Sequence, residues 1–294
     1  MHYQTPSFTA LATALMRSLH TRADPLPLID DPWGERLVPE IVVRKIAERL
    51  PPGDAPGAAV DGWLRANPAY SNVITRARFS EDALRDALAR GVRQAVMIGA
   101  GFDSWALRRP EAAREVQVFE IDHPATQDLK RRRIAACAGG APAGLHFLPA
   151  DLSRESLGEV LARSSFSSDA PAFFSWLGVT MYLSRDANLT TLRAIAGCAA
   201  PGSELVFSYV DQAAFGAGAM AEEFQVLQRS VAKLGEPFVS GFDPAVLAGD
   251  LRAIGLDLIE DCDDTQLVAR YDPQGLNGMR PSIRSRIARV HVAG

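Results

Sequence analysis

The sequence predicts an α/β protein built on a Rossmann-like, doubly wound, mostly parallel sheet of seven strands. Short β-rich runs alternate with helical stretches five times from Gln94 onward. Alternation at this spacing is typical of parallel sheets with helices on both faces. The first run is followed directly by Gly99-Ala-Gly101. Because such folds bind ligands where their strands end, we expect a ligand site at this turn.

The first 90 residues are expected to form a helical cover of the same domain. An apolar stretch from Phe8 to Arg17 predicts an amphipathic first helix. Apolar residues at helical spacing predict two more helices, over 36–50 and 71–90, and Pro51-Pro52-Gly53 would end the first of these. Residues 91–294 would then form the sheet-centred core.

Seven strands are expected in the core, over residues 95–98, 116–121, 145–148, 171–177, 204–210, 256–260 and 286–292. Four helices are expected in the core. One begins at about 125, one ends at about 160, one begins at about 185 and one spans 243–254. Asp243 would cap the last of these helices and Gly255 would end it. A helical insertion at 211–238 interrupts the alternation after the fifth strand. Its position suits a lid or a substrate wall, with an ordinary packing helix as the alternative.

Composition narrows the class of protein. The chain has 294 residues, a net charge of −4 and three unclustered cysteines, which argues against a zinc module or a disulfide framework and favours the reducing cytoplasm. With no basic block, nucleic acid is not an expected partner. No stretch reaches the roughly 18 apolar residues of a spanning helix, so no membrane segment is expected. The sequence leaves the oligomeric state open.

Residues at three successive strand ends suit one nucleoside. Gly99 and Gly101 let a ligand approach the backbone, and Ser104 stands where a dinucleotide-binding turn would need a third glycine. Glu120 and Asp122 end the second strand, where a carboxylate can accept both hydroxyls of a ribose. Asp151 ends the third strand, within reach of a purine amine. The pattern favours a nucleoside ligand without a pyrophosphate.

Several longer runs resemble the leucine carboxyl methyltransferase family of S-adenosylmethionine-dependent enzymes. They include QAVMIGAGFDSWALR at 94–108, VFEIDHPATQ at 118–127, FFSWLGVTMYL at 173–183 and IDDPWGER at 29–36, with GEPF at 235–238 followed by GFDP at 241–244. The likeness runs from about Leu28 to Tyr271. It is closest to the bacterial branch, which includes enzymes of secondary metabolism.

The resemblance implies S-adenosyl-L-methionine as cofactor and a role for each matching position. Gly99 and Gly101 would line its methionine part, and Asp122 would hold its ribose hydroxyls. Asp151 and the backbone of Leu152 would hold its adenine.

One further position in the resemblance is an arginine before the first strand. Arg76 would pair with the cofactor's carboxylate, with Arg78 as the alternative, since the guanidinium binds a carboxylate in bidentate fashion. Two positions depart from the eukaryotic branch of the family: Asp30 replaces a lysine and Leu177 replaces an acid. The details of amino-acid binding and the acceptor are therefore expected to differ.

The expected reaction is O-methylation of a carboxylate of a small molecule or secondary metabolite. A carboxylate, with a pKa of about 4, is ionised at neutral pH and needs no general base, so alignment and water exclusion would suffice. A phenol or alcohol acceptor is an alternative, for which His123, Tyr182 and Tyr209 are the candidate proton acceptors, the two tyrosines also being candidate substrate contacts.

Two different functions are also compatible with the sequence. A nicotinamide-dependent oxidoreductase would use the same sheet, but Ser104 and the Asp151-Leu152 pair count against it. A noncatalytic nucleoside-binding member of the family is kept open by Leu177. No metal ligands are expected, because histidines and cysteines are few and scattered.

Overall fold

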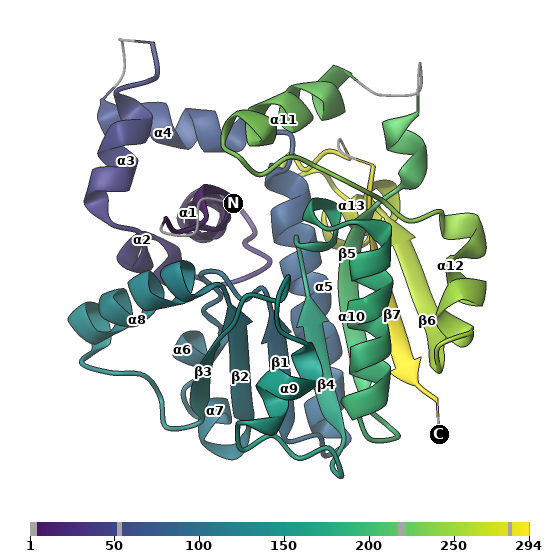
Figure 1. Ribbon diagram of the computed structural model, residues 1–294. Helices are drawn as coiled ribbons and strands as arrows, with labels where there is room; N and C mark the ends of the chain where they lie inside the picture. Colours follow the sequence, from purple (N-terminus) through teal and green to yellow (C-terminus); the bar gives the residue numbers. More distant parts are fainter. Residues whose placement is uncertain (1–4, 52–54, 217–221, 282–283, 294) are drawn as a thin grey trace.

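The centre of the molecule is one seven-stranded sheet, seen in a computed structural model that describes residues 5–51, 55–216, 222–281 and 284–293 (Figure 1). The strand order is β3-β2-β1-β4-β5-β7-β6. Only β7 runs antiparallel to its neighbours β5 and β6, so the predicted mostly parallel sheet is confirmed. The strands are β1 (Gln94–Ile98), β2 (Gln117–Asp122), β3 (Leu145–Pro149), β4 (Ala172–Trp176), β5 (Glu204–Val210), β6 (Leu256–Asp263) and β7 (Ser285–Val292).

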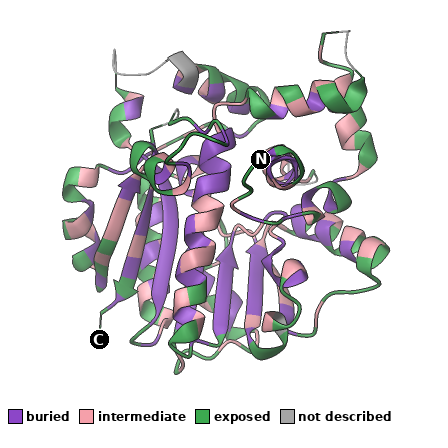
Figure 2. Cartoon of the chain, turned by 180° about the vertical axis from the view of Figure 1, so that it is seen from behind, coloured by how far each residue is buried: buried purple, intermediate pink, exposed green. Residues whose placement is uncertain are grey.

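Helices cover both faces of the sheet because alternate strand residues point to opposite sides. Val96 and Phe174 pack in an apolar cluster with α9 (Leu157–Ala162), α10 (Arg185–Cys198) and α12 (Pro244–Arg252). Their neighbours Ala95 and Phe173 pack instead with α5 (Tyr70–Ala89), α6 (Trp105–Arg108) and α13 (Asp264–Tyr271). Figure 2 shows the strands buried at the centre and the exposed residues on the outer helices.

The N-terminal helices form a separate apolar cluster beside the sheet. They are α1 (Phe8–Ala23), α2 (Trp33–Leu37), α3 (Glu40–Ala47) and α4 (Pro56–Arg65), and they pack with α5 and with Ile134 of α8 (Pro124–Ala138). The single helix predicted over 36–50 is wrong. Val38 is extended because it precedes Pro39, whose ring disfavours helical backbone before it, and so α2 ends and α3 begins there.

The chain after β5 crosses the carboxyl ends of the strands. The short helix η2 (Gln212–Phe215) and α11 (Glu222–Lys233) occupy the predicted insertion, of which 217–221 lie outside the described residues. Phe224 and Val231 of α11 pack against Met181 in the short helix η1 (Thr180–Tyr182). Asp243 caps α12 through the N–H of Ala245, as predicted.

Several short helices were not predicted, among them α4, α6 and η1. Two more are α7 (Ala112–Glu115), which precedes β2, and α13, which joins β6 to β7. A capping box between Asp263 and Gln266 begins α13. None of the helices in the described segments has the length and apolarity needed to cross a bilayer.

Candidate functional site

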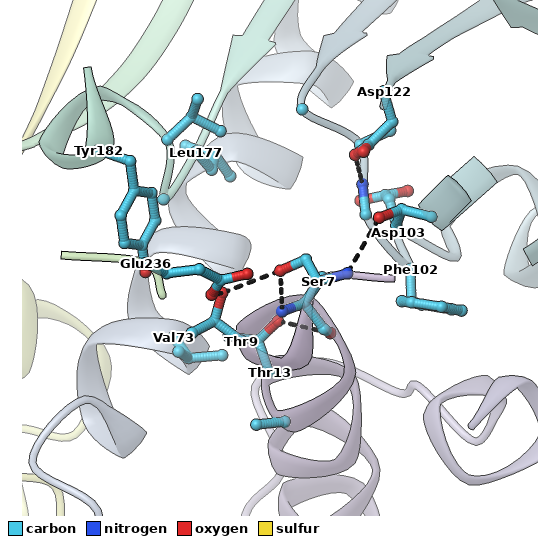
Figure 3. A pocket seen from close by; sticks show the side chains of 18 of the residues that line it. Ser7, Thr9, Thr13, Val73, Phe102, Asp103, Asp122, Leu177, Tyr182 and Glu236 are labelled. Carbon is cyan, nitrogen blue, oxygen red and sulfur yellow. Dashed lines mark hydrogen bonds between the residues drawn. The ribbon is translucent and has the colours of Figure 1, made fainter. Parts of the chain in front are cut away.

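A cavity of about 750 Å³ opens at the carboxyl ends of β1, β2 and β4. Its walls also include residues of α1, α5 and α11, so segments far apart in the sequence meet there. Figure 3 shows Thr9 and Thr13 of α1 and Val73 of α5 at the cavity. Pockets for small molecules span about 300–1,000 Å³. The cavity therefore has the size of a ligand site, and it lies where the sequence predicts one.

The turn after β1 needs glycine at two positions. Gly99 and Gly101 have φ values of +66° and +51°, in the left-handed region that favours glycine. A Cβ on Gly99 would lie 2.4 Å from Cγ2 of Val179. The N–H groups of Gly99 and Ala100 both donate to the Ile121 carbonyl oxygen, at 2.9 and 3.1 Å. The turn thus presents bare backbone to the cavity.

Asp122 lies at the end of β2 and lines the cavity. Its Oδ2 accepts a hydrogen bond from the N–H of Gly101 at 2.5 Å, and its Oδ1 accepts one from the N–H of His123 at 2.6 Å. Burial raises the pKa of Asp122 above its usual range, against the opposing effect of these two N–H groups. Each carboxylate oxygen keeps a second lone pair, so the group can still accept two hydroxyls.

Glu120, the other acid of this strand, does not take part. Its side chain lies deeper in β2 under α8, where Oε2 accepts a hydrogen bond of 2.5 Å from Nζ of Lys130. Glu120 is only 1% exposed and is not among the residues that line the cavity. The interpretation of Glu120 as a ribose ligand is therefore corrected, and Asp122 is the acid at the cavity.

Asp151 and Leu152 line the cavity at the end of β3. Oδ1 of Asp151 accepts hydrogen bonds from the N–H and the hydroxyl of Ser153, at 3.0 and 2.6 Å. Partial burial acts to raise the pKa of Asp151, but the bonds from Ser153 and the charge of Arg154 outweigh it and hold the pKa below its usual range. Asp151 is therefore an ionised acceptor beside the cavity.

The structure separates the two candidate arginines. Arg76 lines the cavity, and Nη1 donates to Oδ1 of Asn72 at 3.1 Å. A Cβ on Gly178, whose φ is +69°, would lie 2.5 Å from Nη2 of Arg76, so this glycine makes room for the guanidinium. Burial lowers the pKa of Arg76 to about 10, which leaves it charged at neutral pH. Within the described residues its side-chain hydrogen bond is the one to Asn72, and it forms no ion pair with them.

Arg78 lies two residues further along α5 and is turned away from the cavity. Its Nε donates to both oxygens of Asp82 at 3.0 Å, and its Nη1 donates to the Leu28 carbonyl at 2.9 Å. The side chain is thus already paired with an acid. Of the two arginines, only Arg76 is placed to meet an anionic ligand in the cavity.

Of the two candidate tyrosines, one lines the cavity and the other does not. Tyr182 lines the cavity, and burial raises its pKa to about 12. Tyr209 is fully buried, and its hydroxyl donates to Oδ2 of Asp261 at 2.9 Å and accepts from Nε of Arg286 at 3.1 Å. Tyr209 does not line the cavity, so its interpretation as a substrate contact is corrected.

Thr9 and Glu236 are among the cavity side chains that sequence reasoning missed. Thr9 of α1 donates a hydrogen bond of 2.5 Å to Oε2 of Glu236, which follows α11. Both residues line the cavity, as does Leu177 at the position where the eukaryotic branch was expected to carry an acid. The only signal for Glu236 was its place in the Gly-Glu-Pro-Phe run, which gave no role.

His123, a candidate proton acceptor, is the N-cap residue of α8. The His123 side chain accepts from the N–H of Ala125 at 3.3 Å and so caps α8. Among the residues that the structure describes, no group of three or more histidines, cysteines or acids is arranged to hold a metal ion.

A family model described as leucine carboxyl methyltransferase matches residues 10–196. The chain belongs to the leucine carboxyl methyltransferase family. It is 30% identical over 276 residues to the "Putative S-adenosyl-L-methionine-dependent methyltransferase YktD" of Bacillus subtilis, covering 88% of this chain and 89% of that protein. A Mycobacterium bovis protein named in the same terms is 34% identical over 203 residues, covering 67% of this chain and 64% of that protein.

The fold of this methyltransferase is also found among solved structures. The crystal structure of a protein from Thermobifida fusca, titled as a putative methyltransferase, aligns with a TM-score of 0.57 at 15% identity, covering 99% of this chain and 96% of that one. The likeness at this identity concerns the fold alone. Together with the family, it supports the predicted Rossmann-like architecture.

The chain is therefore an S-adenosylmethionine-dependent methyltransferase, and the nicotinamide and noncatalytic hypotheses give way to this assignment. The residues of the cavity fit the cofactor. At Gly99 and Gly178 the missing Cβ lets Val179 and the Arg76 guanidinium approach the backbone at the cavity. Arg76 is a charged group held at the cavity by an amide rather than by an acid, and Asp122 retains free lone pairs for hydroxyls.

Proposed function

We propose that this enzyme is an O-methyltransferase that methylates a carboxylate of a small molecule, with secondary metabolites as the acceptor class. The observation that carries the proposal is the position of Tyr182 in the cavity wall. A phenol with the usual pKa of about 10 is already protonated at neutral pH, and burial raises the pKa of Tyr182 further, to about 12. Such a group donates a hydrogen bond to an oxygen that is already anionic, which a carboxylate is. The family's description as a carboxyl methyltransferase supports the same acceptor.

The cofactor's place follows from the cavity walls. In this proposal Gly99 and Gly101 line its methionine part and Arg76 pairs with its carboxylate. Asp122 accepts the ribose hydroxyls. The bound cofactor supplies the reactive methyl group on its sulfonium.

The adenine would lie at the end of β3, where Asp151 and Leu152 line the cavity. The carboxylate of Asp151 can accept from an exocyclic amine, and the backbone N–H of Leu152 can donate to a ring nitrogen. In this proposal the end of β1 binds the methionine part of the cofactor, the end of β2 binds its ribose and the end of β3 binds its adenine.

The remaining work of the protein is to align the acceptor and exclude water. We assign that work to residues 1–90 as a cover and to the insertion 211–238 as a lid. Leu227, Val231 and Leu234 of the insertion line the cavity with apolar surface, and α1 contributes Thr9 and Thr13 from the other side. A dry cavity strengthens the attraction between an anionic acceptor and the sulfonium.

A phenol or alcohol acceptor is the second candidate. Glu236 favours it, because a carboxylate on the cavity wall can accept the proton that a neutral hydroxyl must lose. The two candidates predict products of different stability, since a methyl ester is cleaved by mild alkali and an ether is not.

The test is methyl transfer from isotopically labelled S-adenosylmethionine to a small-metabolite extract. Label that mild alkali releases as volatile methanol is expected. Label that survives alkali would overturn carboxyl methylation and favour the second candidate. The Asp122→Asn variant serves as the matched control, because labelling that depends on this cavity should fall with it.

A further inference from the structure

Glu236 is a buried carboxylate that the cofactor assignment does not use. Its side chain is among the residues that line the cavity, and the residue is only 8% exposed. The hydroxyl of Thr9, at 2.5 Å from Oε2, is its one side-chain hydrogen-bond partner in the described segments. A carboxylate withdrawn from water without a positive partner is costly. A ligand that brings the missing positive charge would remove that cost.

The position of Glu236 separates it from the nucleoside side of the cavity. Figure 3 shows Asp122 at one side of the view and Glu236 at the other, with Thr9 beside Glu236 and Ser7 between the two acids. Arg76 also lines the cavity, but Arg76 and Glu236 form no ion pair with each other in the described residues. Glu236 thus lies next to Tyr182 and away from Asp122, on the side where the proposed function places the acceptor.

Apolar residues lie near Glu236 in the cavity wall, among them Val231, Leu234 and Phe238. The N–H of Glu236 donates to the Val231 carbonyl at 3.0 Å, which holds it against the end of α11. Phe238, two residues on, lies against Tyr182, with ring centroids 5.5 Å apart and ring planes tilted by 55°. A ligand group that meets Glu236 therefore lies beside aliphatic and aromatic walls.

We propose that Glu236 recognises a basic nitrogen on the methyl acceptor, so that the acceptor is a small amphiphile carrying a protonated amine. A hydrogen bond from an ammonium to a carboxylate is roughly twice as strong as one between neutral groups. The amine also explains how an anionic acceptor enters a cavity whose wall is anionic, since its charge offsets the repulsion between two carboxylates. This inference rests on the proposed function, which assigns the acceptor to this end of the cavity.

The experiment uses two probes of equal length, n-hexylammonium chloride and 1-hexanol. Each is titrated at neutral pH into the full-length protein saturated with S-adenosylhomocysteine, and binding is followed by ligand-observed NMR. The ammonium should bind the unmodified protein roughly tenfold more tightly than the alcohol. Equal affinity of the two probes overturns the proposal, and this comparison does not depend on any variant folding.

Two variants then locate the preference. Glu236→Gln should abolish it while leaving S-adenosylhomocysteine binding intact. Glu40→Gln removes an exposed acid of α3 that pairs with Arg44 on the surface, and should keep the preference. An undiminished preference in Glu236→Gln overturns the proposal, even if methyl transfer falls, because that pattern describes a general base rather than a recognition group.

The outcome is separable from that of the proposed function. Alkali-stable label together with an amine preference that Glu236→Gln abolishes would reject carboxyl methylation and keep the recognition of a basic nitrogen. Alkali-labile label without any amine preference would keep carboxyl methylation and reject the recognition.

Discussion

The carboxylate of Asp122 accepts a hydrogen bond of 2.5 Å from the backbone N–H of Gly101, which joins the end of β2 to the turn after β1. The Ile121 carbonyl accepts from the N–H groups of Gly99 and Ala100 and reinforces the same junction. A side chain held this way is aligned before any ligand arrives, which lowers the entropy lost on binding. The junction should therefore be the most sensitive part of the cofactor site.

Asp122→Asn should weaken S-adenosylhomocysteine binding roughly tenfold or more, measured by calorimetry. The amide has one acceptor oxygen where the carboxylate has two, and its NH₂ group faces donors that need an acceptor. Asp128→Asn, which changes an exposed acid of α8 paired with Arg132, is the control and should bind like the unmodified protein. An affinity for Asp122→Asn within about twofold of the unmodified protein would show that this acid does not hold the ribose.

Arg76→Lys and Arg78→Lys form a matched pair on one helix. Arg76→Lys should lower affinity for S-adenosylhomocysteine roughly tenfold, because an ammonium cannot make the bidentate contact of a guanidinium. Arg78→Lys should leave that affinity unchanged, since Arg78 pairs with Asp82 outside the cavity. The opposite ranking by calorimetry would restore Arg78 as the partner of the cofactor's carboxylate.

The sheet was predictable because its strands are short apolar runs that end in recognisable turns. All seven predicted strands are present, with limits that differ by a few residues. Helix limits were harder, since one residue before a proline divided 36–50 into two helices. The helix α13 was missed because the predicted strand stopped at 260. The capping box of Asp263 and Gln266, which marks the start of α13, lies just beyond that limit.

The candidate site was likewise predictable from the sequence only in part. The glycine turn and Asp122 were predictable because each directly follows a strand, and parallel strands end at one edge. Glu236 and Thr9 were not, because they are 227 positions apart and meet only in the folded chain, where the segment after α11 lies against α1 at the cavity. Tyr209 was misassigned because the alternation of residues along a strand does not tell which face of the sheet lies near the ligand. The Tyr209 ring packs instead with Phe207 and Phe242.

Gly99→Ala should destabilise the fold and abolish cofactor binding. Its φ of +66° is strained for alanine, and its Cβ would lie 2.4 Å from Val179. Such strain costs about 1–3 kcal/mol in the free energy of unfolding, measured by urea denaturation. Gly139→Ala is the control, because Gly139 has a φ of +73° but nothing within 4 Å of the added Cβ.

The clash can be isolated by a second substitution. Gly99→Ala should cost more than Gly139→Ala, and Val179→Ala in the Gly99→Ala background should recover the excess beyond its own effect. Equal costs for the two glycine variants would mean that backbone strain alone, without the Val179 contact, requires glycine at 99.

Tyr182→Phe should change the pH dependence of stability only in alkali. Burial raises the folded-state pKa of Tyr182 from its usual value of about 10 to about 12. Between these pH values the folded state binds this proton more tightly than the unfolded state does, so the free energy of unfolding falls as pH rises through the window. Below pH 10 the contribution is fully present, and the phenylalanine variant should show a shallower fall above it in urea denaturation.

The same variant tests the phenol's place in the reaction. Tyr182→Phe should lower kcat/KM for the acceptor, because the donated hydrogen bond is lost, while the activity profile between pH 7 and 10 keeps its shape. Tyr209→Phe, which removes a hydroxyl bonded to Asp261 away from the cavity, should lower stability and leave the KM for the acceptor unchanged. An inflection below pH 10 that disappears in Tyr182→Phe would instead mean that the phenol accepts a proton from the acceptor, and a hydroxyl substrate would replace the carboxylate.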